Sequence, residues 1–220
     1  MNVGSITSLF ACHADDGDAG TDGSRQFRCR LDRLEIQYKR LHADSDGTLC
    51  LNLSGTPITD LAPLRELPLT HLCLQGCYGI TDFSPLREMR LSWLNLCRTR
   101  MTDLSVLTRM PLFHLDLRGT RAADLLPLTG VGLACLDIRF TVIRDVSPLG
   151  QTPLEELSFH PSRIQEGLGV LQGIRTLRTI NRTPAAEFWR KHSTEISTGA
   201  IQPPDLPLRR TSARKMASRT

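Results

Sequence analysis

A single repeated unit constrains the fold of this 220-residue chain more than any other feature. Six stretches follow the pattern L-x-L-x-x-T-x-I-x-D-L-x-P-L-x-x-x-P-L-x-x, and a seventh, degenerate unit closes the series. A unit of this size cannot bury its apolar face alone, whereas stacked units share one continuous core. The period therefore predicts one elongated solenoid domain. Its units begin at Leu51, Leu72, Leu94, Leu115, Leu136, Leu157 and Ile180, with successive starts 21, 22, 21, 21, 21 and 23 residues apart.

Each unit divides into a strand half and a turn half. The alternation in Leu72-Cys-Leu74 places two leucines inward and the middle residue outward, which predicts a short, half-buried strand. Further along the unit, an aspartate precedes a Leu-x-Pro-Leu motif, which is typical of a capped helical turn with proline in its first turn. The short period leaves little room for a longer helix. We expect an α/β solenoid with a parallel sheet on the concave face, short 3-10 turns on the convex face and helical caps at both ends.

A small hydrogen-bonding residue recurs at one fixed offset after each predicted strand. Its hydroxyl or thiol is expected to satisfy backbone groups of the following turn that would otherwise be buried unpaired. Cys77 occupies this position in the second unit, so we expect it to point inward in place of a threonine. The recurring residues are Thr56, Cys77, Thr99, Thr120, Thr141 and Ser162, and the capping aspartates are Asp60, Asp82, Asp103, Asp124 and Asp145.

Both ends of the array are predicted to carry caps. Apolar residues at helical spacing predict an N-terminal capping helix within 25–44, extending to about His42. The repeat domain with its C-terminal cap spans 45–192. In that cap, Thr183 as capping residue and Pro184 at the first helical position predict a closing helix.

The two termini differ from the array in composition. Residues 1–24 are rich in Asp, Gly and Ala, and such a leader cannot bury enough apolar surface to become ordered. Residues 193–220 are basic and rich in Ser, Thr and Pro. We expect a disordered acidic leader and a disordered basic tail.

Charge and cysteine content bear on the class of partner. The net charge of +4 is small, and the basic residues form no continuous stripe through the repeats, so we expect no nucleic-acid partner. No segment approaches the roughly 18 apolar residues that a membrane helix needs, so we expect no membrane partner.

The seven cysteines are odd in number and include no CxxC pair. This usage indicates reduced thiols and a cytoplasmic location.

The segment Ile58-Thr-Asp-Leu-Ala-Pro-Leu64, with counterparts at 80–86 and 142–149, resembles the leucine-rich repeats of internalins and of related intracellular proteins. One departure is that internalins carry asparagine at the turn position that is threonine in this chain. The resemblance implies a binding module.

The end of the array carries a closer resemblance. Thr179-Ile-Asn181, followed by Pro184-Ala-Ala-Glu-Phe-Trp189, resembles bacterial repeat segments found downstream of serine/threonine protein kinase domains. The likeness covers roughly residues 45–192. It implies a module that is often attached to another domain, although the chain has none of the glycine loop, catalytic lysine or metal-binding aspartate segments of a kinase.

The outward positions of the predicted strands form rows on the concave face. These rows hold aromatic, histidine and arginine side chains, which contribute most to binding energy at protein interfaces. We expect this face to bind the partner; the alternative is that the same positions are merely solvated. The candidate partner-binding residues are His71, Trp93, Asn95, His114, Asp116, Arg118, Asp137 and Arg139.

The same face offers little for catalysis or metal binding. Its His and Cys residues are spread over four predicted strands, whereas a structural zinc site needs four ligands around one point, so we expect no metal and no cofactor. Asp116 and Asp137 are neighbours across strands, but Arg118 and Arg139 stand beside them, which favours a salt-bridged surface over acid–base chemistry. The chain has no G-x-S-x-G, H-E-x-x-H or Walker motif.

These observations predict a non-catalytic module that binds a protein partner through its concave repeat surface. The alternative, which follows from the kinase-linked resemblance, is a regulatory or targeting subunit, or a detached repeat region, of a serine/threonine kinase or phosphatase system. A third interpretation is a hydrolase that uses surface carboxylates or cysteines, with Cys97 and Cys135 as the candidate thiols, and no motif supports it.

Overall fold

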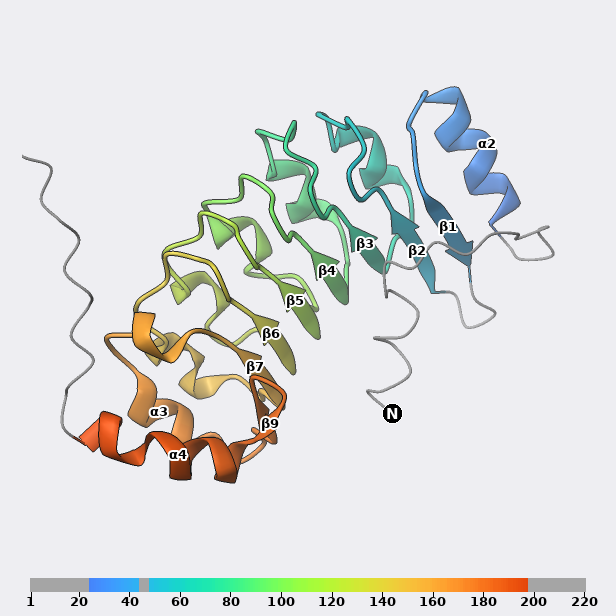
Figure 1. The fold of residues 1–220 in the computed structure, drawn as a ribbon. Helices are drawn as coiled ribbons and strands as arrows, with labels where there is room; N and C mark the ends of the chain where they lie inside the picture. The colour runs from blue at the N-terminus through green and yellow to red at the C-terminus, as the bar shows by residue number, and fades with distance from the viewer. Residues whose placement is uncertain (1–23, 44–47, 198–220) are drawn as a thin grey trace, which may run out of the picture.

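The computed structural model describes residues 24–43 and 48–197. The expected acidic leader, except Ser24, and most of the expected basic tail lie outside these residues. The described chain forms a curved stack of repeats with a helix at each end (Figure 1). Strands lie on the inner side of the curve and short helical turns on the outer side, which confirms the predicted solenoid.

One nine-stranded sheet, in chain order, runs through the described part of the molecule. β2 to β8 are parallel, while β1 and β9 pair antiparallel at the two edges. Equivalent repeat positions face each other in every parallel pair, as Leu51 faces Leu72 and Leu72 faces Leu94. The strands are β1 (Arg40–Ala43), β2 (Leu49–Asn52), β3 (His71–Cys73), β4 (Trp93–Asn95), β5 (His114–Asp116), β6 (Cys135–Asp137), β7 (Glu156–Ser158), β8 (Thr179–Ile180) and β9 (Thr183–Pro184).

Short 3-10 turns form the outer side of the repeats. In five of them the predicted aspartate carboxylate accepts a backbone N–H two residues further on, at 2.7 to 2.8 Å. These bonds satisfy amides that the start of a helical turn leaves unpaired. Asp103 is the N-cap of η3, as predicted, whereas in the other four turns the aspartate lies one residue before the N-cap. The turns are η1 (Ala62–Glu66), η2 (Ser84–Glu88), η3 (Leu104–Leu107), η4 (Leu126–Leu128), η5 (Ser147–Gln151) and η6 (Pro161–Arg163).

The recurring threonines close the turns between strand and outer side. The hydroxyl groups of Thr99, Thr120 and Thr141 donate to the carbonyl three residues earlier at 2.6 to 2.7 Å. Cys77 is fully buried, and its thiol donates to the carbonyl of Leu53 at 3.0 Å, which confirms the predicted inward position. The prediction is wrong at Ser162, whose exposed side chain lies within η6 and makes no such bond, because the repeat pattern changes there.

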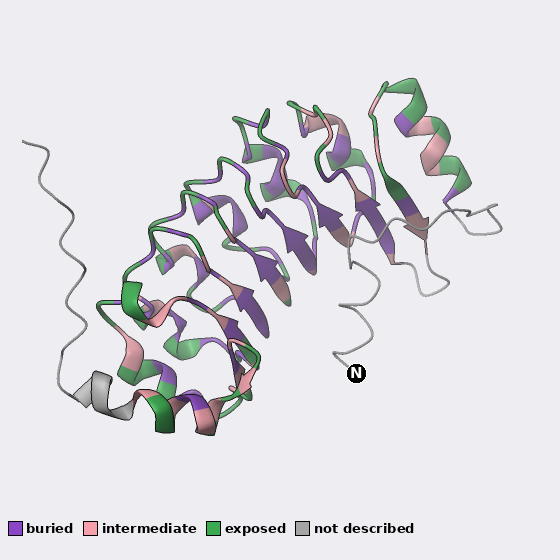
Figure 2. Ribbon diagram, viewed as in Figure 1, coloured by how far each residue is buried: buried purple, intermediate pink, exposed green. Residues whose placement is uncertain are grey.

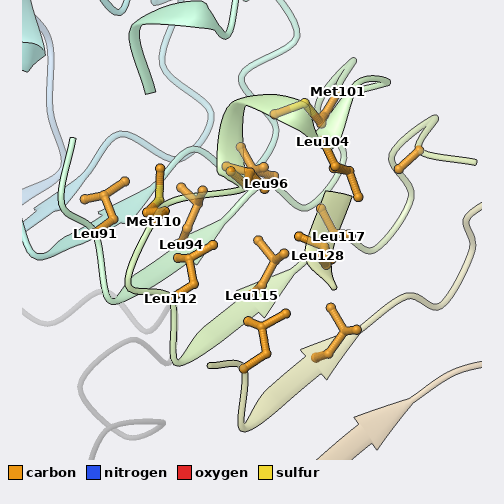
Figure 3. Packing of buried hydrophobic residues seen from close by; sticks show 14 of the residues in the cluster. Leu91, Leu94, Leu96, Met101, Leu104, Met110, Leu112, Leu115, Leu117 and Leu128 are labelled. Atoms are coloured by element: carbon orange, nitrogen blue, oxygen red, sulfur yellow. The ribbon is translucent and has the colours of Figure 1, made fainter. Parts of the chain in front are cut away.

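The core is a stack of leucine layers between the sheet and the outer turns. Leu94 and Leu96 of one repeat pack beside Leu115 and Leu117 of the next, and all four are fully buried (Figure 3). Buried positions recur in every strand from β2 to β8, whereas the edge strands β1 and β9 are partly exposed (Figure 2). Each leucine removed from water contributes about 1.5 to 3 kcal/mol, so the stack is held mainly by contacts between neighbouring repeats.

The N-terminal cap differs from its prediction. α2 (Arg25–Arg33) is shorter than expected and ends in a Schellman motif with Glu35 at φ 53°. There the N–H of Ile36 donates to the Leu31 carbonyl at 3.0 Å. The rest of the expected helix is a turn and a short loop over 34–39, followed by β1, which pairs with β2. An exposed edge of the sheet would leave a row of backbone groups unpaired, and β1 satisfies them.

The C-terminal cap contains two short helices and a tight hairpin. α3 (Leu168–Gln172) replaces the 3-10 turn in the last unit, and α4 (Ala185–Ser197) closes the array beyond the expected boundary at 192. Phe188 of α4 is buried against Phe159, with ring centroids 5.8 Å apart, so α4 covers the final core layer.

The closing helix begins at Ala185, one residue later than expected. Thr183 and Pro184 form β9 instead of a helix cap, because Asn181 and Arg182 adopt positive φ angles of 52° and 65° and make a two-residue hairpin. Such a turn matches the twist of the paired strands. The Asn181 side chain also accepts the N–H of Phe159 at 2.9 Å, which ties the hairpin to the preceding repeat.

Candidate interaction surface

Three of the predicted residues form a stack of rings across the inner face. Because β3, β4 and β5 pair in register, His71, Trp93 and His114 occupy equivalent positions on adjacent strands. The ring centroids of His71 and Trp93 are 6.3 Å apart, and those of Trp93 and His114 are 5.2 Å apart with an interplanar angle of 11°. Trp93 is only 6% exposed and the two histidines are half-buried. The stack is therefore a preformed, rigid part of the face.

Burial changes the acid–base behaviour of one member of this stack. Desolvation lowers the pKa of His114, and the positive charge of Arg118 lowers it further. The carboxylates of Asp116 and Asp137 act in the opposite direction and offset only part of the effect. His114 is therefore held in its neutral form near pH 7.

Two aspartate–arginine pairs continue the face on β5, β6 and the residues that follow these strands. Arg118 donates to the Asp116 carboxylate through Nη2 at 2.7 Å and through Nε at 2.9 Å. Arg139 donates to the Asp137 carboxylate in the same way, through Nη2 at 2.6 Å and through Nε at 3.0 Å. A contact of 3.5 Å between Arg118 Nε and Asp137 joins the pairs. The sequence-based expectation of a salt-bridged surface is confirmed.

The carboxylates of these pairs also hold the backbone. Asp116 and Asp137 accept the N–H groups of Arg118 and Arg139 at 2.9 and 3.0 Å. Asn95 accepts the amide of the residue two positions later in the same way, at 2.8 Å. All three side chains thus have a structural role in the turn that leaves the strand.

The structure brings the eight predicted residues together on β3 to β6 and the adjoining turns, but it buries several of them. Trp93, Asn95 and Asp116 are at most 7% exposed, because side chains on the inner side of a curved sheet crowd one another. Arg118 and Arg139 remain accessible, at 35% and 26% of their side chains. The accessible part of the face therefore consists mainly of arginine and histidine.

The sequence interpretation missed a second group of side chains, directly beyond the strand ends. We call this group the loop edge. Tyr78, Phe140 and Val142 are 57%, 64% and 57% exposed, and the arginines among them are exposed as well. The loop edge consists of Tyr78, Arg98, Arg100, Arg121, Phe140 and Val142.

Backbone geometry shows why two of these residues stand out. The turn after each strand has a positive φ angle, and glycine supplies it at Gly76 and Gly119, at 70° and 65°. Arg98 and Phe140 occupy the same position, at 54° and 60°. A side chain in this left-handed region costs about 1 to 2 kcal/mol. This departure from the repeat's own glycine is the sequence signal that could have identified the loop edge.

The thiols considered as nucleophiles are buried. Desolvation raises the pKa of Cys97 and raises that of Cys135 to about 12. A thiol protonated at neutral pH is a weak nucleophile. Among the residues that the structure describes, no three or more His, Cys, Asp or Glu side chains are grouped so that they could hold a metal ion.

A search of the described helices finds none that is long and apolar enough to cross a membrane.

Comparison with models of known protein families and with curated protein sequences gives no match. Among solved structures, the chain is similar to internalin C2 from Listeria monocytogenes, at 24% identity and a TM-score of 0.50, over 60% of this chain and 69% of that one. It is also similar to internalin InlF from the same organism, at 17% identity and a TM-score of 0.46, over 60% of this chain and 53% of that one. The architecture and the likeness to internalin C2 agree: this chain folds as a leucine-rich-repeat solenoid.

Proposed function

We propose that the protein is a non-catalytic binding module whose partner is another protein, held on the inner face of β3 to β6 together with the loop edge. The observation that carries this proposal is the row of exposed Tyr, Arg and Phe side chains beside an inner face that is already ordered. Residues of these types dominate binding energy at interfaces. A face whose side chains are fixed before binding loses little conformational entropy when the partner arrives.

The size of the inner face supports the inclusion of the loop edge. The four strands β3 to β6 lie about 4.8 Å apart, and each has three residues and is about 10 Å long, so they cover on the order of 190 Å². A standard protein interface buries about 800 Å² on each partner. The strands alone are therefore too small for a stable complex, and the loop edge provides the additional contact area.

Capture of the partner from native lysate by paired variants tests the proposal. The double variant Asp137→Ala/Arg139→Ala removes an ion pair from the inner face without changing the net charge. The matched control Arg65→Ala/Glu88→Ala removes an ion pair of similar length, 2.7 Å, from the outer turns. We expect the inner-face variant to lose the partner and the control to retain it. Both variants are first checked for unchanged thermal unfolding.

Loss of the partner by the control alone would place the binding surface on the outer turns. Equal recovery by both folded variants would reject a role for the Asp137–Arg139 pair in binding.

We further propose that the module works in a reducing compartment such as the cytoplasm. The structure describes six cysteines, none of which forms a disulfide bond with another described residue, and five of the six are buried in the repeats. Stable, buried thiols of this kind are typical of proteins kept under reducing conditions.

The second candidate is a regulatory or targeting role in a serine/threonine kinase or phosphatase system. It rests on the closing sequence that resembles kinase-linked repeats, which in this fold builds the β8–β9 hairpin and α4. If this candidate is correct, the captured partner carries kinase or phosphatase activity. A partner without such activity would reject it and leave the first proposal intact.

A further inference from the structure

A basic hollow lies in the loop edge, outside the residues predicted from the sequence. It has a volume of about 320 Å³ and is lined by Tyr78, Arg98, Thr99, Arg100, Gly119 and Arg121. The lining comes from three successive repeats, at the ends of β3, β4 and β5 (Figure 1). The volume is at the lower end of the range for ligand sites, which suits one chemical group better than a whole small molecule.

The three arginines of the hollow have no acidic partner. In the part of the chain that the structure describes, none of Arg98, Arg100 and Arg121 forms an ion pair. Arg118 and Arg139 on the neighbouring face are each neutralised by an aspartate. The lining thus holds three positive charges and no negative one, and their mutual repulsion favours an anion between them.

The backbone conformation at Arg98 is energetically unfavourable for a residue that carries a side chain. Arg98 has a φ angle of 54° at a position where other repeats use glycine. The Arg98 stem passes over Gly119 of the next repeat, since an added Cβ atom there would lie 3.4 Å from the Arg98 Cγ. Residues held in an unfavourable backbone conformation cluster at functional sites.

We propose that this hollow binds a phosphate monoester carried by a side chain of the partner protein. A phosphate monoester has a charge of about −1.5 to −2 and three acceptor oxygens, which three guanidinium groups can match. Guanidinium groups bind both carboxylates and phosphates through two parallel hydrogen bonds, but a phosphate monoester carries more charge and three acceptor oxygens, so it can bind more than one guanidinium at once. The identity of the partner as a protein rests on the proposed function above, whereas the anion chemistry rests on the hollow alone.

The test is a titration of the full chain with a short fluorescent peptide that carries one phosphoserine. The same peptide without phosphate and a version with two glutamates in place of the phosphoserine serve as comparisons. We expect the phosphorylated peptide to bind about tenfold tighter than either, because charge-assisted hydrogen bonds to a dianion are lost in both. Binding should also weaken as salt is added.

Variants locate the binding in the hollow. Arg98→Gly removes one guanidinium and relieves the strained φ angle, so the protein stays folded while affinity for the phosphorylated peptide falls about tenfold. Arg182→Gly likewise removes one exposed guanidinium and a positive φ angle, of 65°, in the β8–β9 hairpin, and Arg163→Ala removes one exposed positive charge outside the hollow. We expect both controls to bind within about twofold of the original chain.

Three outcomes would overturn the proposal. Equal affinity for the phosphorylated and unphosphorylated peptides would exclude a phosphate site. Tighter binding of the glutamate peptide would assign the hollow to an acidic segment instead. An equal loss of affinity in Arg163→Ala and Arg98→Gly would mean that only the overall charge matters.

The phosphate site and the proposed function can fail separately. If the peptide does not bind but lysate capture still depends on Asp137 and Arg139, the binding module stands and the phosphate site falls. If the peptide binds at the hollow while the inner-face variant still captures every partner, the phosphate site stands and the inner face is not the docking surface.

Discussion

Single hydroxyl groups hold the turns of this solenoid. The Thr141 side chain is 3% exposed, and its hydroxyl donates to the Ile138 carbonyl at 2.6 Å. A buried carbonyl that loses its donor costs about 1 to 3 kcal/mol. The same bond recurs at Thr99 and Thr120, so three consecutive central repeats share it.

Thr141→Val tests this role with little change in side-chain volume. We expect the variant to lose about 1 to 2 kcal/mol of unfolding free energy, measured by urea denaturation. Thr141→Ser keeps the donor and should lose less. A valine variant as stable as the original chain would show that the hydroxyl bond is not needed.

His114 gives the fold a pH dependence. Its pKa in the folded protein is lowered, chiefly by desolvation, below the unfolded value of about 6.5. As the pH falls, the unfolded chain binds a proton before the folded chain does. Stability is therefore complete above about pH 6.5 and declines from there down to the folded pKa.

The variant His114→Phe keeps a ring in the stack but cannot take up a proton. We predict that thermal unfolding of the original chain shifts to lower temperature between pH 7.5 and pH 5.5 by more than that of the variant. Identical shifts in both proteins would assign the acid sensitivity to other groups.

Residue roles on the inner face were only partly predictable from the sequence. The repeat register correctly placed Trp93, Asn95 and Asp116 in rows, because equivalent positions pair across every parallel strand. Their burial was not predictable, since it depends on how closely the curved sheet brings neighbouring side chains together. The sequence also gave no sign that Asn95 and Asp116 accept backbone amides.

At the level of elements, the central repeats follow the sequence closely and the caps do not. The repeat pattern occurs six times in the sequence, so a single deviating residue does not change the prediction. Each cap occurs once, and its prediction depends on a few residues. The spacing in 25–44 fits a helix throughout, but the helix ends at Arg33 because the free edge of β2 needs a hydrogen-bonding partner. That requirement comes from the assembled sheet and is not visible in the local sequence.

The last repeat contains an approach between two backbone segments that only glycine permits. Gly167 precedes α3 at φ 87°, and a Cβ atom there would lie 2.2 Å from the backbone nitrogen of Ser147. Gly167→Ala should therefore destabilise the protein by about 3 kcal/mol, measured by urea denaturation. Gly130→Ala is the matched control, because Gly130 also has a positive φ angle, of 76°, but nothing lies within 4 Å of its added Cβ.

We expect the Gly130→Ala control to lose only the conformational cost of about 1 kcal/mol. Equal destabilisation by both substitutions would show that the φ angle matters and the close approach does not.

Across the whole molecule, the two sides of the curve differ in their chemistry. The outer turns are built around proline, capping aspartates and scattered exposed residues such as Leu126, at 65% exposure. The inner side and the loop edge gather rings and arginines over consecutive repeats. Because the solenoid keeps equivalent positions adjacent, a few substitutions at one repeat position create an extended surface. This arrangement is the physical basis for assigning binding to the inner side.

Hydroxyl-radical footprinting of the protein with its captured partner tests that assignment most directly. Oxidation of Tyr78 and Phe140 reports on the loop edge, and oxidation of Leu126 reports on the outer turns. In the isolated chain, the exposed fraction of Leu126 is close to those of Tyr78 and Phe140. We predict that oxidation of Tyr78 and Phe140 falls severalfold in the complex while oxidation of Leu126 stays unchanged. Protection of Leu126 with Tyr78 and Phe140 still reactive would contradict binding through the inner face and its loop edge.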